Sequence, residues 1–99
     1  MGVINDHTAN DVLDIVLHEL AVAEAVHPTY PSDPLRRTAL VAEEAGEAVR
    51  EALDLTRSSL PAAQLAPTRK RLERELIHTA AMAVKALIAM REEDEREHE

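Results

Sequence analysis

The apolar residues of this chain recur every three or four positions in three long segments, and this spacing constrains the fold more than any other feature. The segments are residues 8–26, 34–55 and 68–90. Such a repeat places apolar side chains on one face of an α-helix. Tyr30 is the only Phe, Tyr or Trp residue, and a core of Ala, Leu, Val and Ile suits close-packed helices better than strands. We therefore predict an all-α helical bundle with three main helices.

Capping residues and prolines mark the ends of the first two helices. Thr8 begins a Thr-Ala-Asn-Asp stretch that fits a capping box, so we expect the first helix to start there. We expect it to end before Pro28, because the residue that precedes a proline avoids the helical region. Asp33 and Pro34 suit the N-cap and the first residue of the second helix, which should run to about Leu55.

The third helix is expected to begin at Thr68, after a loop over residues 56–67 that contains two Ser and two Pro and could include one helical turn at residues 61–65. It should run to about residue 90, or further into the charged tail 91–99. We expect that tail to be a solvated, fraying helix end. With 99 residues, the chain is predicted to form a single domain over residues 1–99, and its thin, Ala-rich core predicts that a partner subunit completes the bundle.

Composition excludes several classes of protein. The chain has no Cys, so it forms neither a disulfide framework nor a zinc–thiolate site. The net charge of −8 argues against binding to a nucleic-acid polymer, which needs a basic surface. No apolar run approaches the length of a membrane span, and the N-terminus lacks a signal-peptide pattern. We expect a soluble, cytoplasmic protein without a membrane partner.

Two pairs of potential metal ligands stand out: Glu44 with Glu47, and Glu75 with His78. Each pair is spaced i, i+3, so its two side chains share one face of a helix. If the two faces met, they would form an oxygen-rich cage with one imidazole. Hard divalent cations such as Mg²⁺ or Mn²⁺ prefer such ligands, so the pattern predicts a Mg²⁺ or Mn²⁺ site.

Structural ion pairs are the alternative explanation for these carboxylates. Glu75 lies in a helical row that is otherwise apolar or nearly so, and a partly buried carboxylate needs a cation or a hydrogen-bond partner. Arginines near the motifs could supply that charge instead of a metal: Arg36, Arg37, Arg71 and Arg74. The Glu-x-x-His pair is also the unit of di-iron carboxylate bundles. A second pair would then have to come from a symmetric dimer.

Residues 40–48 (LVAEEAGEA) and 72–84 (LERELIHTAAMAV) together resemble the MazG-like, all-α nucleoside triphosphate pyrophosphohydrolases. The pattern of that family is EExxE followed on the next helix by ExxD. The chain looks most like the short members from actinobacteria and their phages. The resemblance covers residues 35–90, and His78 stands where the family usually has Asp.

The resemblance implies an enzyme that cleaves a nucleoside triphosphate to a monophosphate and pyrophosphate, acting as a homodimer or homotetramer. By motif position, a metal would be held by four residues: Glu44, Glu47, Glu75 and His78. Glu43 would orient or activate the attacking water as the catalytic residue. Lys85 and Arg71 would contact phosphates, and Tyr30 would stack on the base. A non-catalytic MazG-like bundle that binds a nucleotide or a protein, and a helical di-metal carboxylate protein, remain the alternatives.

Overall fold

The computed structural model describes residues 4–26 and 30–98, and this part of the chain is entirely helical apart from short connections. It forms three helices: α1 (Asp6–Val26), α2 (Pro34–Leu55) and α3 (Ala62–Glu97). No strand is present within the described residues. The prediction of an all-α chain with three main helices is thus confirmed.

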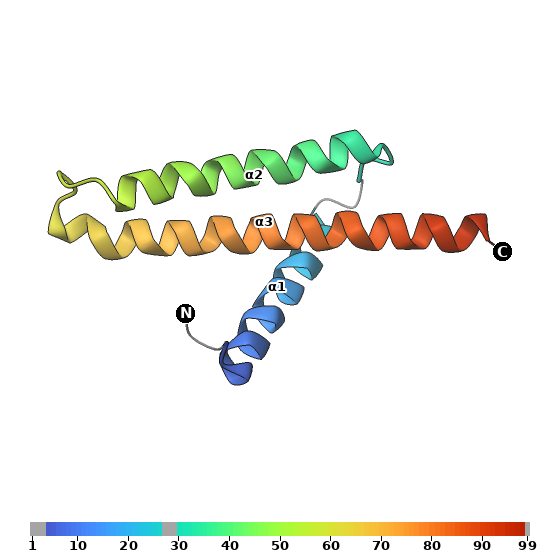
Figure 1. Cartoon of the computed structure of the whole chain (residues 1–99), viewed down its shortest axis with the longest axis horizontal. Coiled ribbons are helices and arrows are strands. Elements are labelled where there is room, and N and C mark those ends of the chain that lie inside the picture. Colours follow the sequence, from blue (N-terminus) through green and yellow to red (C-terminus); the bar gives the residue numbers. More distant parts are fainter. Residues whose placement is uncertain (1–3, 27–29, 99) are drawn as a thin grey trace.

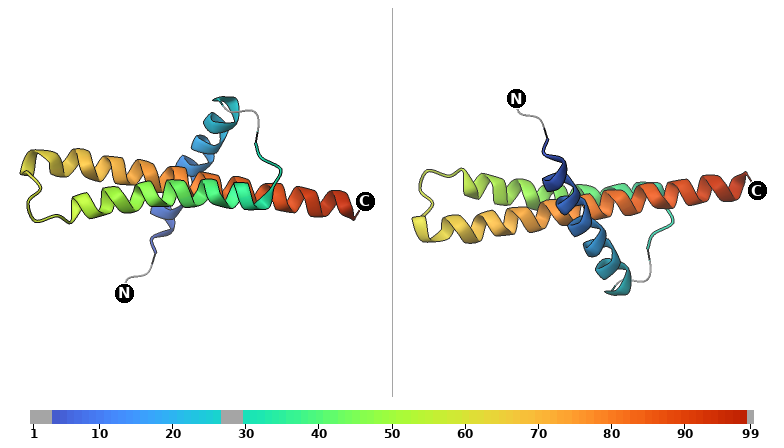
Figure 2. Two further views of the ribbon diagram at one scale, coloured as in Figure 1. Left: turned by 90° about the horizontal axis from the view of Figure 1, so that it is seen from above. Right: turned by 90° about the horizontal axis from the view of Figure 1, so that it is seen from below.

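The helices form an antiparallel hairpin that is crossed by a third helix. Figure 1 shows α2 lying along α3 for most of its length, whereas α1 crosses α3 steeply near its middle. The two views of Figure 2 confirm that α1 lies on the other side of α3 from α2. The C-terminal end of α3 extends beyond α2, and the molecule measures 56 × 30 × 27 Å.

Local capping explains where α1 and α2 begin. The Asn5 side chain accepts a hydrogen bond from the Thr8 amide at 3.1 Å, so α1 starts two residues earlier than the predicted Thr8. Asp33 caps α2 as predicted, accepting from the Leu35 amide at 3.0 Å, with Pro34 as the first helical residue. Pro28, the predicted stop of the first helix, lies outside the described residues.

The predicted start of the third helix was wrong by six residues. Residues 62–66 (AAQLA) are helical because Ala, Gln and Leu have high helix propensity, and Pro67 lies inside α3. Pro67 is tolerated near the N-terminus, where it removes one backbone hydrogen bond. Thr68 is therefore not a cap. It is 1% exposed, and its hydroxyl accepts a hydrogen bond from Arg71 at 2.9 Å.

The charged tail continues α3 to Glu97, as one form of the prediction has it, but Glu93 within it binds the start of α2. Arg37 is 4% exposed, forms an ion pair with Glu93 and donates to the Pro31 carbonyl at 2.7 Å. The guanidinium of Arg37 lies 5.7 Å from the centroid of the Tyr30 ring, and the Lys85 ammonium lies 4.5 Å from it. We refer to Tyr30, Arg37, Lys85 and Glu93 as the latch, since they tie the segment before α2 to the C-terminal half of α3.

The apolar core is small and lies where α1 crosses α3. Val16 and Leu20 of α1 pack on Ala81 of α3. Many large apolar side chains remain at least 50% exposed, among them Leu13, Leu53, Leu76 and Leu87. None of the described helices has the length and hydropathy required to cross a lipid bilayer.

Candidate metal centre

Beside this core, the three helices bring together four carboxylate and imidazole side chains. Glu75 and His78 are one turn apart on α3 and project to the same side of it. Glu44 approaches them from α2, and Glu19 approaches His78 from α1. Glu44 lies about 40° around α2 from the buried Ala48, which places it at the edge of the face that packs on α3.

Glu44, Glu75 and His78 form a group that could hold a metal ion. One ligand atom from each lies within 4.8 Å of the other two, and all three residues are half-buried. Oε2 of Glu44 and Oε2 of Glu75 are shielded from solvent and have no hydrogen-bond partner within the described part of the chain. Shielded carboxylate oxygens without partners are costly, and two negative charges this close repel each other. A cation between them would offset both costs.

His78 lies between two carboxylates from different helices. Its Nε2 is 3.1 Å from Oε1 of Glu19, which is a hydrogen-bonding distance. Its Nδ1 is 3.8 Å from Oε2 of Glu44, which is too long for a direct hydrogen bond. The two ring nitrogens therefore have different surroundings: Nε2 lies against Glu19, whereas Nδ1 faces Glu44 without a direct hydrogen bond.

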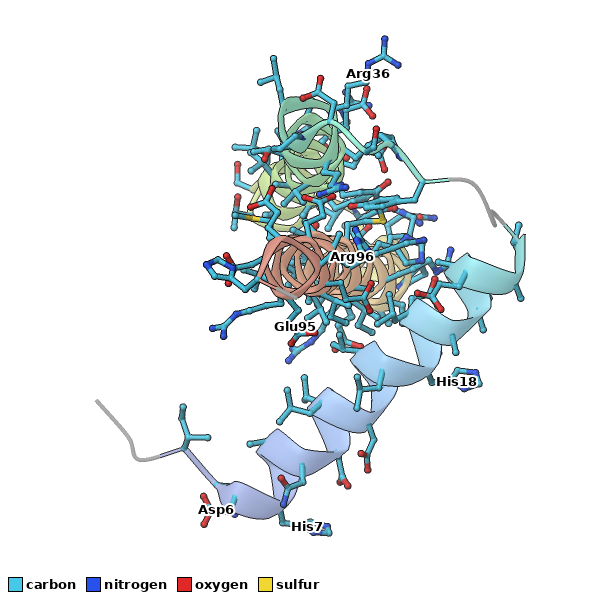
Figure 3. All side chains as sticks on the ribbon, turned by 90° about the vertical axis from the view of Figure 1, so that its right-hand side faces the viewer. Asp6, His7, His18, Arg36, Glu95 and Arg96 are labelled. Atoms are coloured by element: carbon cyan, nitrogen blue, oxygen red, sulfur yellow. The ribbon has the colours of Figure 1, made fainter. Side chains whose placement is uncertain are left out.

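Arginine does not neutralise these carboxylates, as far as the structure describes the chain. Arg37 pairs with Glu93, and Arg71 pairs with Glu51 at 3.2 Å. Arg36 is exposed and points away from α3 in Figure 3. Arg74 is also exposed and forms no ion pair there. The arginine ion pairs considered from the sequence therefore do not form at Glu44 or Glu75 within the described residues. The group that approaches Glu44 is His78.

Glu43 and Glu47 lie outside this group within the chain. Both are exposed. Each residue of a helix advances about 100°, so Glu47 is turned about 100° from Ala48 and Glu43 about 140° from it. Spacing of i, i+3 puts Glu47 on the same broad side of α2 as Glu44, but further toward solvent. Glu47 and Glu43 can reach an ion only from the solvent side or with help from another subunit.

The residues predicted to bind substrate lie in two places. Arg71 is two turns before His78 on α3 and is engaged by Glu51 and Thr68. Lys85 and Tyr30 contact each other in the latch, two turns after His78. Burial raises the pKa of the Tyr30 hydroxyl, and the positive charge of Arg37 partly offsets that rise.

A groove of about 330 Å³ opens directly beside the metal group. Its walls are mainly apolar and are formed by Val22, Ala23 and Val26 of α1 together with Ala81 and Met82 of α3. Glu19, Glu44 and His78 line it as well, so the groove places an apolar surface next to the charged cluster.

Glu19 is the site residue that the sequence analysis missed. It is half-buried, and it interrupts a row of α1 that is otherwise apolar: Ile15, Val22 and Val26. The same argument singled out Glu75 on the third helix. Applied to the first helix, it would have indicated Glu19. By contrast, His7 and His18 of α1 are exposed, and Figure 3 shows them pointing away from α2 and α3.

The ligand types fit a divalent cation. Two carboxylates and one imidazole suit Mg²⁺, Mn²⁺ or a transition metal, and the imidazole shifts the preference toward the latter ions. Ligand atoms on opposite sides of Mg²⁺ would be about 4.2 Å apart, from Mg–O distances near 2.1 Å. The observed limit of 4.8 Å is slightly wider, so small side-chain rotations would be enough to close the group around an ion.

Comparison with known proteins adds no assignment: no protein-family model, curated protein or solved structure matches this chain. The resemblance to MazG-like proteins therefore stays a prediction from the sequence motifs.

Proposed function

We propose that this protein binds a divalent cation at Glu44, Glu75 and His78 and hydrolyses a nucleoside triphosphate to a monophosphate and pyrophosphate. One observation carries the metal part of the proposal. Within residues 4–26 and 30–98, Oε2 of Glu44 and Oε2 of Glu75 are shielded and lack hydrogen-bond partners, they lie in one group with His78, and no arginine or lysine forms an ion pair with either. The choice of reaction is supported by the motif resemblance of residues 40–48 and 72–84.

In this proposal the chain supplies ligands, a proton acceptor and a binding groove. A bound Mg²⁺ or Mn²⁺ would neutralise phosphate charge and lower the pKa of a coordinated water. The attacking water must lose a proton as its oxygen bonds to the α-phosphorus and pyrophosphate leaves. We assign that proton to the Glu43 carboxylate, and we assign Glu47 to the solvent side of the ion. The apolar groove next to His78 would accommodate the base and sugar.

The remaining substrate contacts are assigned to the cations along α3. Lys85 follows His78 by two turns, so a triphosphate that lies along α3 would extend from the metal toward its ammonium group. Tyr30 lies against that ammonium, 4.5 Å from ring centroid to Nζ. Arg71 lies at the opposite side of the metal group, where Glu51 and Thr68 already bind it. It is a weaker match for phosphate than Lys85.

We also propose that the working form is a homodimer or homotetramer. The chain exposes 7786 Å², whereas a compact monomer of 10.9 kDa would expose about 5,600 Å². The difference of about 2,000 Å² per chain is in the range of obligate interfaces. The exposed apolar side chains that such an interface would cover lie on all three helices, for example Leu13, Val49 and Leu76.

A non-catalytic bundle that binds a metal or a nucleotide is the second candidate. It is favoured by the direction in which Glu43 points, away from the group that would hold the ion. The di-metal carboxylate alternative would need a second Glu-x-x-His pair from a partner subunit.

A metal-supplemented activity screen tests the proposed reaction. The wild-type protein is incubated with each nucleoside triphosphate and either Mg²⁺ or Mn²⁺, and pyrophosphate and orthophosphate are measured separately. We expect pyrophosphate from at least one substrate and a loss of roughly 100-fold or more in Glu44→Gln, which removes a charged ligand. Glu73→Gln, at an exposed position of α3, should leave the rate unchanged. Metal binding without pyrophosphate release would select the non-catalytic alternative.

A further inference from the structure

Glu19 connects α1 to the candidate metal centre through the far side of the His78 ring. Its Oε1 is 3.1 Å from Nε2 of His78, and its side chain is 30% exposed. Figure 1 shows that α1 approaches α3 only where the two helices cross, so Glu19 reaches His78 from a helix that contains none of the motif residues.

We propose that Glu19 is a positioning residue: its carboxylate accepts a hydrogen bond from Nε2–H of His78 and so presents Nδ1 to the metal. This inference rests on the metal site of the proposed function. A neutral imidazole has one N–H and one lone pair. With the proton on Nε2, 3.1 Å from Oε1 of Glu19, the lone pair lies on Nδ1, which faces Glu44.

The distance on the Nδ1 side agrees with this assignment. Nδ1 of His78 and Oε2 of Glu44 are 3.8 Å apart. Both atoms are acceptors in the proposed tautomer, so they have no attraction for each other, but they can share a cation as neighbouring ligands. A carboxylate that holds the second nitrogen of a metal-bound histidine fixes the orientation of the ring and makes it a better ligand.

The packing of α1 determines where Glu19 lies. Val16 and Leu20, the buried residues of α1, stand on either side of Glu19 in the sequence and pack on Ala81, one turn after His78. The contact of α1 with α3 and the orientation of the His78 ring are therefore coupled. By linkage, metal binding should in turn strengthen the docking of α1.

Two measurements on a small set of variants test the role of Glu19. The first is the affinity for Mn²⁺ by calorimetry, and the second is the tautomer of the His78 ring by ¹⁵N NMR, with and without Mg²⁺. The variants are Glu19→Ala, which removes the acceptor, and Glu19→Gln, which keeps an acceptor oxygen. Glu24→Ala, at an exposed position of α1, is the matched control. Val16→Ala loosens the docking of α1 without removing the acceptor.

We expect the Nε2–H tautomer in the wild type and in Glu19→Gln, and a mixture of tautomers in Glu19→Ala. The Mn²⁺ affinity should fall by roughly tenfold or more in Glu19→Ala, less in Glu19→Gln, and not at all in Glu24→Ala. An unchanged tautomer in Glu19→Ala would overturn the inference. So would an equal loss of affinity in Val16→Ala and Glu19→Ala, because Glu19 would then act through docking alone.

The failure of the proposed metal site would look different. In that case the wild type and Glu44→Gln would bind Mn²⁺ equally weakly, whereas the tautomer of the metal-free protein would still report whether Glu19 holds Nε2–H.

Discussion

At the scale of single residues, the three glutamates of the EExxE motif differ in how far their carboxylates are buried. Glu44 is half-buried and has a shielded oxygen, whereas Glu43 and Glu47 are exposed. The rotation of 100° per residue explains this difference, since the face that packs on α3 is centred near Ala48. Negative charge at the candidate centre therefore comes from Glu44 and Glu75, and from Glu19 on the other side of His78. His78 is the residue that distinguishes this centre from an all-carboxylate cage.

Replacing His78 with Asp tests the role of the imidazole. His78→Asp would convert the ligand set to carboxylates alone, so we expect the preference between Mn²⁺ and Mg²⁺ to shift by about tenfold toward Mg²⁺. Calorimetric titration of the wild type and the variant with each ion gives the ratio of affinities. An unchanged ratio would show that His78 does not contact the ion.

Replacing Glu75 with Gln tests whether its charge is uncompensated in the metal-free protein. Because the variant removes one of two neighbouring negative charges, we expect it to raise the free energy of unfolding of the metal-free protein by about 1 kcal/mol. It should also abolish the stabilisation that Mn²⁺ gives the wild type. Urea unfolding with a chelator and with Mn²⁺ measures both effects. A large loss of stability with the chelator present would contradict this account.

At the scale of helices, the sequence predicted the elements whose signals are local. Asp33 and Pro34 define the start of α2 by direct contact with the next residues, and the structure confirms them. The predicted start of α3 was wrong because a turn at residues 61–65 was expected to be separate from the helix, whereas residues 62–66 continue into α3 through Pro67. Whether a proline interrupts a helix or is tolerated in it depends on the energy of the whole segment.

The candidate site was predictable to the extent that it depends on spacing along one helix. Glu75 and His78 were found from their i, i+3 relation, and Glu44 from the facing motif. The apolar row of α1 that Glu19 interrupts could have indicated this residue, but its contact with His78 depends on the angle at which α1 crosses α3. No periodicity encodes that angle. The pairing of Arg37 with Glu93 is likewise a contact over 56 residues, which no local pattern shows.

The latch between α2 and α3 predicts a dependence of stability on pH. The hydrogen bond from Arg37 holds the pKa of the Glu93 carboxyl below its ordinary value of 4.5. A carboxyl whose pKa is lowered in the folded state stabilises the fold fully at pH values above its ordinary pKa. This contribution is lost as pH falls through the lowered pKa. We expect Glu93→Gln to have a lower Tm than the wild type at pH 7 and a smaller further loss below pH 4.5.

Thermal unfolding at several pH values measures this effect. Glu92→Gln, the exposed neighbour, is the control and should follow the wild type at every pH. If Glu93→Gln and the wild type lost stability in parallel on acidification, the ion pair in the latch would contribute nothing to the pH dependence.

At the scale of the whole molecule, the chain is more open than a compact domain of its length. Its radius of gyration is 16.3 Å, against about 13 Å for a compact domain of 100 residues. Among the residues that the structure describes, four apolar ones are buried, Val16, Leu20, Ala48 and Ala81, and three of them are in the cluster at the α1–α3 crossing. A second copy that covers the exposed apolar faces would enlarge this core.

Sedimentation tests the proposed assembly. We expect a dimer or tetramer at micromolar concentration, because the total accessible surface exceeds that of a compact monomer by an amount typical of obligate interfaces. Leu13→Asp and Leu76→Asp, at exposed apolar positions of α1 and α3, identify which helix forms the interface. A stable, folded monomer in the wild type would rule out the assembly.

The central claim is that Glu44, Glu75 and His78 bind a divalent cation, and a calorimetric titration with Mn²⁺ tests it most directly. The titration compares the wild type with Glu75→Gln and with Glu73→Gln, whose side chain lies two residues away on α3 and is 65% exposed. We predict saturable binding of Mn²⁺ by the wild type, a loss of about tenfold or more in affinity for Glu75→Gln, and no change for Glu73→Gln. Equal affinities in all three proteins, or no saturable binding by the wild type, would contradict the claim.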